Sequence, residues 1–160
     1  MSPLKAACAL ALATALSLAA APAHAAGEDP GAWAELNKTY TATGAYAYEP
    51  FGVKAEYART DTCASDPAGG MGYHYVNPEY IGSLDPATPA ALLYEDGAAG
   101  TRKLVAVEWV VKDEGQDAPT LFGETFQDDQ LPGHFTLHAW IYKPNPSGLF
   151  APWNPEVECP

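Results

Sequence analysis

The stretch KLVAVEWVV, residues 103–111, decides the fold. Its side chains are apolar at odd and at even positions alike, apart from Glu108. Because side chains alternate between the two faces of a strand, this pattern is typical of a central strand that is buried on both faces. Because of this alternation, one predicted face carries Leu104, Ala106, Glu108 and Val110. The other predicted face carries Val105, Val107, Trp109 and Val111.

Shorter β-prone stretches lie on either side of this strand. MGYHYV at 71–76 is rich in aromatic residues and ends at Asn77-Pro78. The sequence between 95 and 100, EDGAAG, is typical of a hairpin turn, which predicts that residues 91–94 pair with the central strand. Residues 120–122 and 134–142 complete the predicted strands.

The N-terminal part of the chain has helical patterns instead. Residues 28–44 begin with a capping aspartate before proline and carry Trp33, Leu36 and Tyr40 at helical spacing. Residues 49–59 predict a second short helix with Phe51, Ala55 and Ala58 on one face, and residues 60–70 predict a loop. The sequence therefore predicts a single α+β domain, with short helices followed by an antiparallel sheet.

The first 25 residues have the pattern of a secretory signal peptide. Lys5 precedes an apolar run rich in Ala and Leu, and Ala23-His24-Ala25 is a small-x-small cleavage sequence. We therefore expect cleavage after Ala25, a mature domain of residues 26–160, a secreted or periplasmic location, and no membrane insertion after cleavage.

The remaining composition limits the partners. The full chain has 8 basic and 20 acidic residues, and cleavage removes one lysine and no acid, which leaves a net charge of −13. Nucleic acids and anionic membrane surfaces bind basic patches, so this acidity argues against both. Cys63 and Cys159 are the cysteines left in the mature chain, and an oxidising compartment favours a disulfide between them.

Glu108 is the residue that most needs an explanation. A carboxylate inside a buried strand costs several kcal/mol unless it is paired, protonated or bound to a cation. His74 and His138 each lie within another predicted strand, so the three side chains could converge on one face. Three interpretations stay open: a buried polar network, a metal-free ligand or catalytic pocket, and a two-histidine, one-carboxylate site for Zn, Fe or Mn.

Other candidate residues surround this cluster. His134 lies four residues before His138, about 13 Å away along a strand, so we place it at the rim of the site. Aromatic residues near the predicted strands could line a pocket for a small organic molecule; these are Tyr73, Tyr75, Trp140 and Trp153. The proline-rich segment 143–155 is interpreted first as a cover over the core and second as a lid.

Four segments together resemble a family of small exported bacterial proteins: GGMGYHYVNP (69–78), ALLYE (91–95), LVAVEWVV (104–111) and LHAWIYKPNPSGLFAPWNPEVEC (137–159). The resemblance covers roughly residues 40–159 and includes Cys63, which agrees with pairing to Cys159. It implies that His74, Glu108 and His138 lie inside the motifs of the family, and it implies no activity.

We therefore expect an exported protein that binds a small molecule at these three residues, with metal-assisted chemistry as one form of this function. In an enzyme, the histidines would ligate a metal or move protons, and Glu108 would be a ligand or a general base. The alternative is a non-catalytic secreted or periplasmic module whose polar cluster is structural. The sequence contains no nucleophile or phosphate-binding motif that specifies a reaction, and it does not indicate an oligomeric state.

Overall fold

The computed structural model of the protein describes residues 30–160, so the predicted signal peptide lies outside the described part. No helix within this part is long and apolar enough to span a membrane. The elements in chain order are α1 (Pro30–Thr43), η1 (Gly44–Ala47), α2 (Glu49–Lys54), β1 (Cys63–Asp66), β2 (Gly69–Val76), η2 (Pro78–Tyr80), β3 (Ala91–Asp96), η3 (Ala98–Gly100), β4 (Arg102–Lys112), β5 (Thr120–Leu121), β6 (Glu124–Thr125) and β7 (His134–Ala139).

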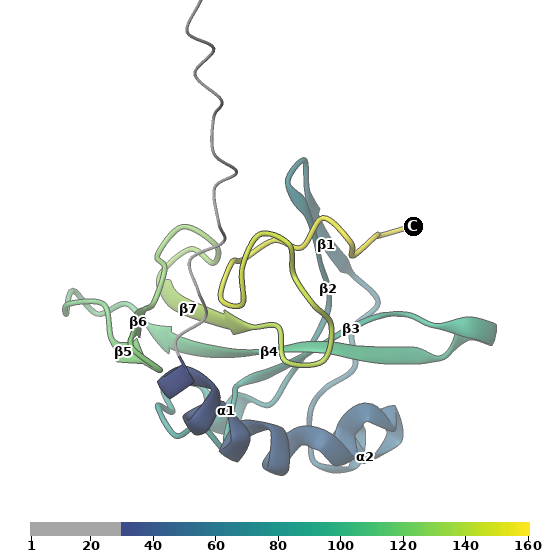
Figure 1. The fold of residues 1–160 in the computed structure, drawn as a ribbon, viewed down its shortest axis with the longest axis horizontal. Coiled ribbons are helices and arrows are strands. Elements are labelled where there is room, and N and C mark those ends of the chain that lie inside the picture. Colours follow the sequence, from purple (N-terminus) through teal and green to yellow (C-terminus); the bar gives the residue numbers. More distant parts are fainter. Residues whose placement is uncertain (1–29) are drawn as a thin grey trace, which may run out of the picture.

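Five of the strands form an antiparallel sheet in the order β1-β2-β3-β4-β7. Figure 1 shows α1 and α2 along one face of this sheet and the C-terminal segment along the other. This arrangement confirms the predicted α+β class and the β3–β4 hairpin. Strand β4 is an interior strand, and its residues 104–110 are buried, as its two apolar faces predict.

The predicted division of β4 into two faces is wrong at one end. A β-bulge shifts the register where Leu93 pairs with Ala106 but Tyr94 pairs with Leu104. Leu104 therefore belongs to the helix-side core, and Val105 belongs to the core on the opposite face. The reason is that a bulge inserts one extra residue into a strand and reverses the alternation beyond it.

The helices also present different faces from those predicted. In α1 the buried residues are Ala32, Leu36, Thr39 and Thr43. Trp33 and Tyr40 are 41% and 54% exposed. Because aromatic rings and threonine methyl groups are both partly apolar, their spacing alone did not distinguish the buried face from its neighbour.

The second helix is shorter than predicted, and part of the predicted loop is a strand. Helix α2 ends at Lys54, and Glu56 has a positive φ of 68°, which stops helical continuation. Gly52 is buried there while Phe51 is 51% exposed. Residues 63–66 form the edge strand β1 rather than a loop; they lack the apolar alternation that identifies a half-buried strand.

The C-terminal segment is held against β2 by backbone contacts. Strand β7 ends at Ala139, three residues earlier than predicted, because Tyr142 and Lys143 donate their N–H groups to the Val105 carbonyl. Further along, Gly70 and Asn154 exchange two backbone hydrogen bonds of 3.0 Å. The Cys63–Cys159 disulfide then fixes the end of the segment, which confirms the predicted pairing.

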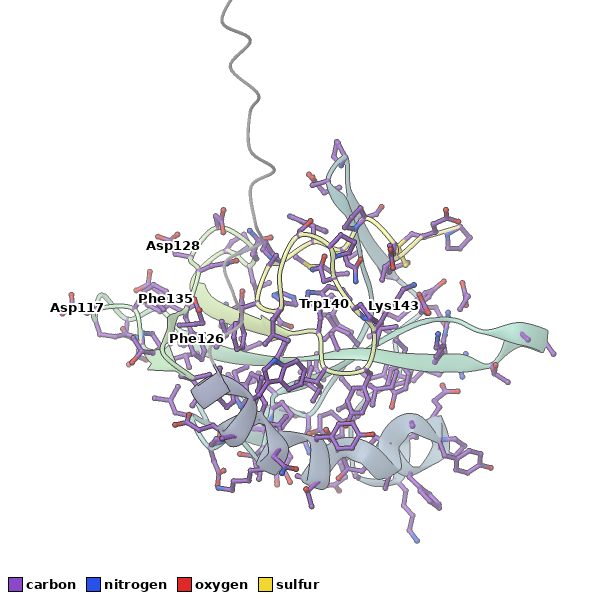
Figure 2. All side chains as sticks on the ribbon, viewed as in Figure 1. Asp117, Phe126, Asp128, Phe135, Trp140 and Lys143 are labelled. Atoms are coloured by element: carbon purple, nitrogen blue, oxygen red, sulfur yellow. A yellow bond between two sulfur atoms is a disulfide. The ribbon has the colours of Figure 1, made fainter. Side chains whose placement is uncertain are left out.

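Asparagine side chains supply hydrogen-bond donors to carbonyl groups in the irregular backbone of this segment. The Asn154 amide donates to the Pro144 carbonyl at 3.0 Å, and the Asn145 amide donates to the Trp153 carbonyl at 3.0 Å. Trp140, Trp153 and Val157 pack over the face of the sheet that carries Leu93 and Ala106. In Figure 2, Trp140 lies beneath the C-terminal segment, beside the sheet. The segment therefore covers the core, as predicted.

Removal of the disulfide is expected to lower the free energy of unfolding substantially. The bridge joins residues 96 positions apart, and a loop of that length corresponds to about 4–5 kcal/mol of lost chain entropy in the unfolded state. A Cys63→Ala, Cys159→Ala double variant should show this loss in urea denaturation. Reduced wild-type protein is the control and should lose the same amount; a loss under about 1 kcal/mol in both would contradict the prediction.

A methyl group at Gly70 should displace the C-terminal segment. A Cβ atom there would lie 2.5 Å from the Val157 carbonyl oxygen and 2.9 Å from its Cγ1. We expect Gly70→Ala to reduce the free energy of unfolding by about 1–3 kcal/mol in urea denaturation. Gly44→Ala is the control, because its nearest neighbour is the Tyr142 Oη at 4.0 Å. Equal stability of the two variants would contradict the close packing at Gly70.

Candidate metal centre

Three strands bring the predicted cluster together on the face that the C-terminal segment covers. Glu108 on β4 lies directly opposite His138 on β7 and, on its other side, opposite Ala91 on β3. His74 comes from β2, which lies beyond β3. On β2, His74 pairs with Leu93 and Val76 pairs with Ala91, so His74 lies diagonal to Glu108 across β3.

The two imidazole rings face opposite oxygens of one carboxylate. His138 Nε2 lies 3.5 Å from Glu108 Oε1, and His74 Nε2 lies 3.6 Å from Glu108 Oε2. One ligand atom from each of the three residues lies within 4.8 Å of the others. Among the residues the structure describes, this is the one group of three or more His, Cys, Asp or Glu side chains with such geometry.

The cluster is deeply placed and opens on one side. The side chains of His138 and Glu108 are 1% and 8% exposed, whereas that of His74 is 23% exposed. The edge at His74 is therefore the part of the cluster that contacts solvent.

Burial favours the uncharged form of all three groups. It raises the pKa of Glu108 to about 8 and lowers the pKa of His138 to about 3, with a smaller lowering from the neighbouring His74. Burial also lowers the pKa of His74 to about 4, while a hydrogen bond with the Gly72 backbone acts in the opposite direction. Without a cation, the cluster at neutral pH is a neutral carboxylic acid between two neutral imidazoles.

The hydrogen bonds expected of a buried polar network are missing from His138. Within residues 30–160, neither its Nδ1 nor its Nε2 has a hydrogen-bond partner. The contact of 3.5 Å with Glu108 is longer than a normal N–H···O hydrogen bond. Because buried polar atoms in proteins are nearly always paired, His138 is arranged for a partner other than these side chains.

The predicted aromatic side chains do not all join the cluster. Tyr73 and Tyr75 belong to the core on the helix side of the sheet, because they alternate with His74 along β2. Their hydroxyl groups donate to Asp96 and Glu49, at 2.8 and 2.6 Å.

Trp140 and Trp153 lie on the same face as the cluster, within the apolar layer beneath the C-terminal segment. Trp140 also lines a separate pocket of about 340 Å³ with Trp33 and Tyr142.

His134 pairs with Lys112, four positions from His138, and is not one of the three candidate metal ligands. Further pockets of about 370 and 430 Å³ adjoin the disulfide.

The sequence interpretation missed one residue on this face. Thr136 lies two positions before His138 on β7, is fully buried, and has an Oγ1 without a hydrogen-bond partner in the described part of the chain. The alternation of the strand already placed Thr136 on the histidine face. Its burial could not be known without the neighbouring backbone.

Comparison of the chain with protein-family models, with curated proteins and with solved structures gives no match. The resemblance of its motifs to small exported proteins therefore stays a prediction. What the chain does has to be inferred from its own geometry.

Proposed function

We propose that the protein is an exported metal-binding protein that holds one divalent transition-metal ion between His74, Glu108 and His138. The observation that carries this proposal is the pair of distances of 3.5 and 3.6 Å, with both Nε2 atoms facing one carboxylate and making no hydrogen bond to it. A cation placed between the two Nε2 atoms and the Glu108 carboxylate would be the missing partner of His138 Nε2. Two imidazoles and one carboxylate are a common ligand set for Zn, Fe and Mn.

The ideal spacing of ligand atoms differs between the metals that this ligand set binds. In a tetrahedral zinc site, bonds of about 2.05 Å place ligand atoms about 3.4 Å apart. Adjacent ligands of an octahedral ion with similar bonds lie only about 3.0 Å apart. The distances of 3.5 and 3.6 Å run to two different oxygens of Glu108, and the three ligand atoms lie within 4.8 Å of one another, so the side chains would draw together around either kind of ion.

Three protein ligands leave at least one coordination position for water or a small molecule. Since His74 is the exposed member, a ligand would reach the metal along its edge of the cluster. The burial of Glu108 and His138, and the position of Tyr73 and Tyr75 on the other face, favour a small ligand over a bulky organic one. In this setting a metal-bound water is the group that would carry metal-assisted chemistry.

Export is part of the proposal. The disulfide supports an oxidising compartment, and the N-terminal pattern of a signal peptide agrees with it.

The competing function is a secreted module whose cluster is structural. The unpartnered Nε2 of His138, 3.5 Å from Glu108, weighs against this alternative, because a structural network would join the two groups by a hydrogen bond.

Glu108→Gln should abolish tight metal binding without unfolding the protein. Gln is close in shape to the protonated glutamic acid that burial favours, but it is a poor metal ligand. We expect purified wild-type protein without a His tag to bind one Zn²⁺ per chain in titration calorimetry. The variant should bind at least about 100-fold more weakly, with a metal-free melting temperature within about 3 °C of wild type.

His134→Ala is the matched control, since it removes a histidine from the same strand but not from the cluster. It should bind zinc within about threefold of wild type. A wild-type protein without stoichiometric metal would exclude the metal site. A large fall in the melting temperature of Glu108→Gln, with no metal to lose, would instead identify a structural network.

Metal affinity should rise with pH. Both histidines are already neutral above about pH 4, whereas Glu108, with a pKa of about 8, must lose its proton to bind a cation. The apparent affinity should therefore increase roughly 50-fold between pH 6 and pH 8, with release of one proton per ion near pH 6. The bound metal lowers the pKa of Glu108, so the metal-induced rise in melting temperature should also grow over this range. Calorimetry in buffers of different ionisation enthalpy would measure the proton, and a pH-independent affinity would contradict the prediction.

A further inference from the structure

His138 and Thr136 carry unused polar atoms on the same strand. The Nδ1 of His138 and the Oγ1 of Thr136 are both buried and unpartnered among the described residues. The backbone of Thr136 is not available to either, because its N–H and carbonyl are both paired with Gln127 at 2.8 Å. Each of the two side-chain atoms therefore lacks a hydrogen-bond partner that a small bridging group would supply.

Strand geometry places these side chains close together. Residues two apart on a strand share a face, with their Cα atoms about 7 Å apart. The residues between and beside them, Phe135, Leu137 and Ala139, belong to the helix-side core. Trp140 follows the end of β7, and its indole N–H already donates to the Ala151 carbonyl at 2.6 Å. Thr136 is therefore the neighbour on this strand with a polar side-chain atom to offer.

We propose that Thr136 is a positioning residue for the metal centre, holding His138 through one buried water; this inference rests on the proposed function. His138 Nδ1–H donates to the water, and the water donates to Thr136 Oγ1. This fixes the proton on Nδ1 and leaves the Nε2 lone pair directed at the cation. Metal-binding histidines generally donate their second ring N–H in this way, and such partners affect metal affinity.

His74 provides the comparison within the same site. For His74, an interaction with the Gly72 backbone opposes the lowering of its pKa by burial. His138 has no such backbone partner in residues 30–160, although it is the more deeply buried ligand. A water needs at least two polar partners to be held in a protein interior, and Thr136 together with His138 provides them.

The test compares three variants in Zn²⁺ titration calorimetry. Thr136→Val removes the hydroxyl and keeps the shape, and it should weaken zinc binding about 10–100-fold. Thr136→Ser keeps the hydroxyl and should bind within about threefold of wild type. Thr39→Val is the matched control: Thr39 is another fully buried threonine with an unpartnered Oγ1, but it lies on α1, on the opposite side of the sheet. It should leave zinc affinity unchanged.

A second measurement identifies the protonated ring nitrogen of His138 directly. Nitrogen-15 NMR of the metal-free wild type should show His138 as the Nδ1–H tautomer, and Thr136→Val should reduce the population of that tautomer. An Nε2–H tautomer in the wild type would overturn the inference even if Thr136→Val failed to fold.

The remaining outcomes separate the two proposals. Equal zinc affinity of Thr136→Val and wild type would overturn the role of Thr136 and leave the metal site intact. Equal weakening by Thr136→Val and Thr39→Val would also overturn it, since loss of any buried hydroxyl would then suffice. A wild-type protein that binds no zinc would overturn the proposed function itself, and this inference with it.

Discussion

Burial of β4 on both faces is the constraint on which the rest of the structure depends. One face is covered by α1, through Leu36, and by Tyr57, which follows the end of α2. The other is covered by a segment without regular secondary structure, through Trp140 and Val157. An irregular segment cannot satisfy its own backbone groups, so it needs outside partners. The Gly70–Asn154 backbone pair and the side chains of Asn145 and Asn154 provide hydrogen-bond partners for this segment. The disulfide anchors its end.

The same constraint gives Glu108 its chemistry. A carboxyl group in a strand with two buried faces loses its contact with water, and its pKa rises to about 8. Antiparallel pairing places His138 directly opposite Glu108. A shift of the pairing by one residue would move every side chain of the strand to the other face, so burial of the sheet fixes this register. The C-terminal segment closes the face above. The close approach of Glu108 and the two histidines is therefore a consequence of strand pairing and of how the sheet is covered, and the edge at His74 remains exposed.

Much of this could be predicted from the sequence, and the failures have physical causes. The two-sided apolar run of β4 identified an interior strand, and the alternation of residues identified the three converging side chains. The faces of α1 could not be assigned, because Trp33 and Leu36 are both apolar and the pattern does not say which faces the sheet. The bulge beside Leu93 depends on a mismatch between β3 and β4, so the sequence of neither strand alone predicts it. Tyr73 and Tyr75 could have been placed on the opposite face from His74, since the period of two already required it.

Because burial favours the neutral forms of Glu108 and the two histidines, the fold does not need the proposed metal to neutralise a buried charge. In a zinc finger the ligands have no stable arrangement without metal, and binding energy is folding energy. Here the protonated Glu108 and the neutral histidines can remain buried without a cation, in a sheet held by its own core and a disulfide. The cost of ionising Glu108 then falls on the binding step. At pH 7, with a pKa of about 8, that cost is about 1.4 kcal/mol, or a factor of about ten in affinity. This cost is small beside the binding free energy of a three-ligand zinc site, so the proposed ion would still bind tightly. Burial of the protonated Glu108 lowers the stability of the metal-free fold at neutral pH, because the same carboxyl is ionised in the unfolded chain.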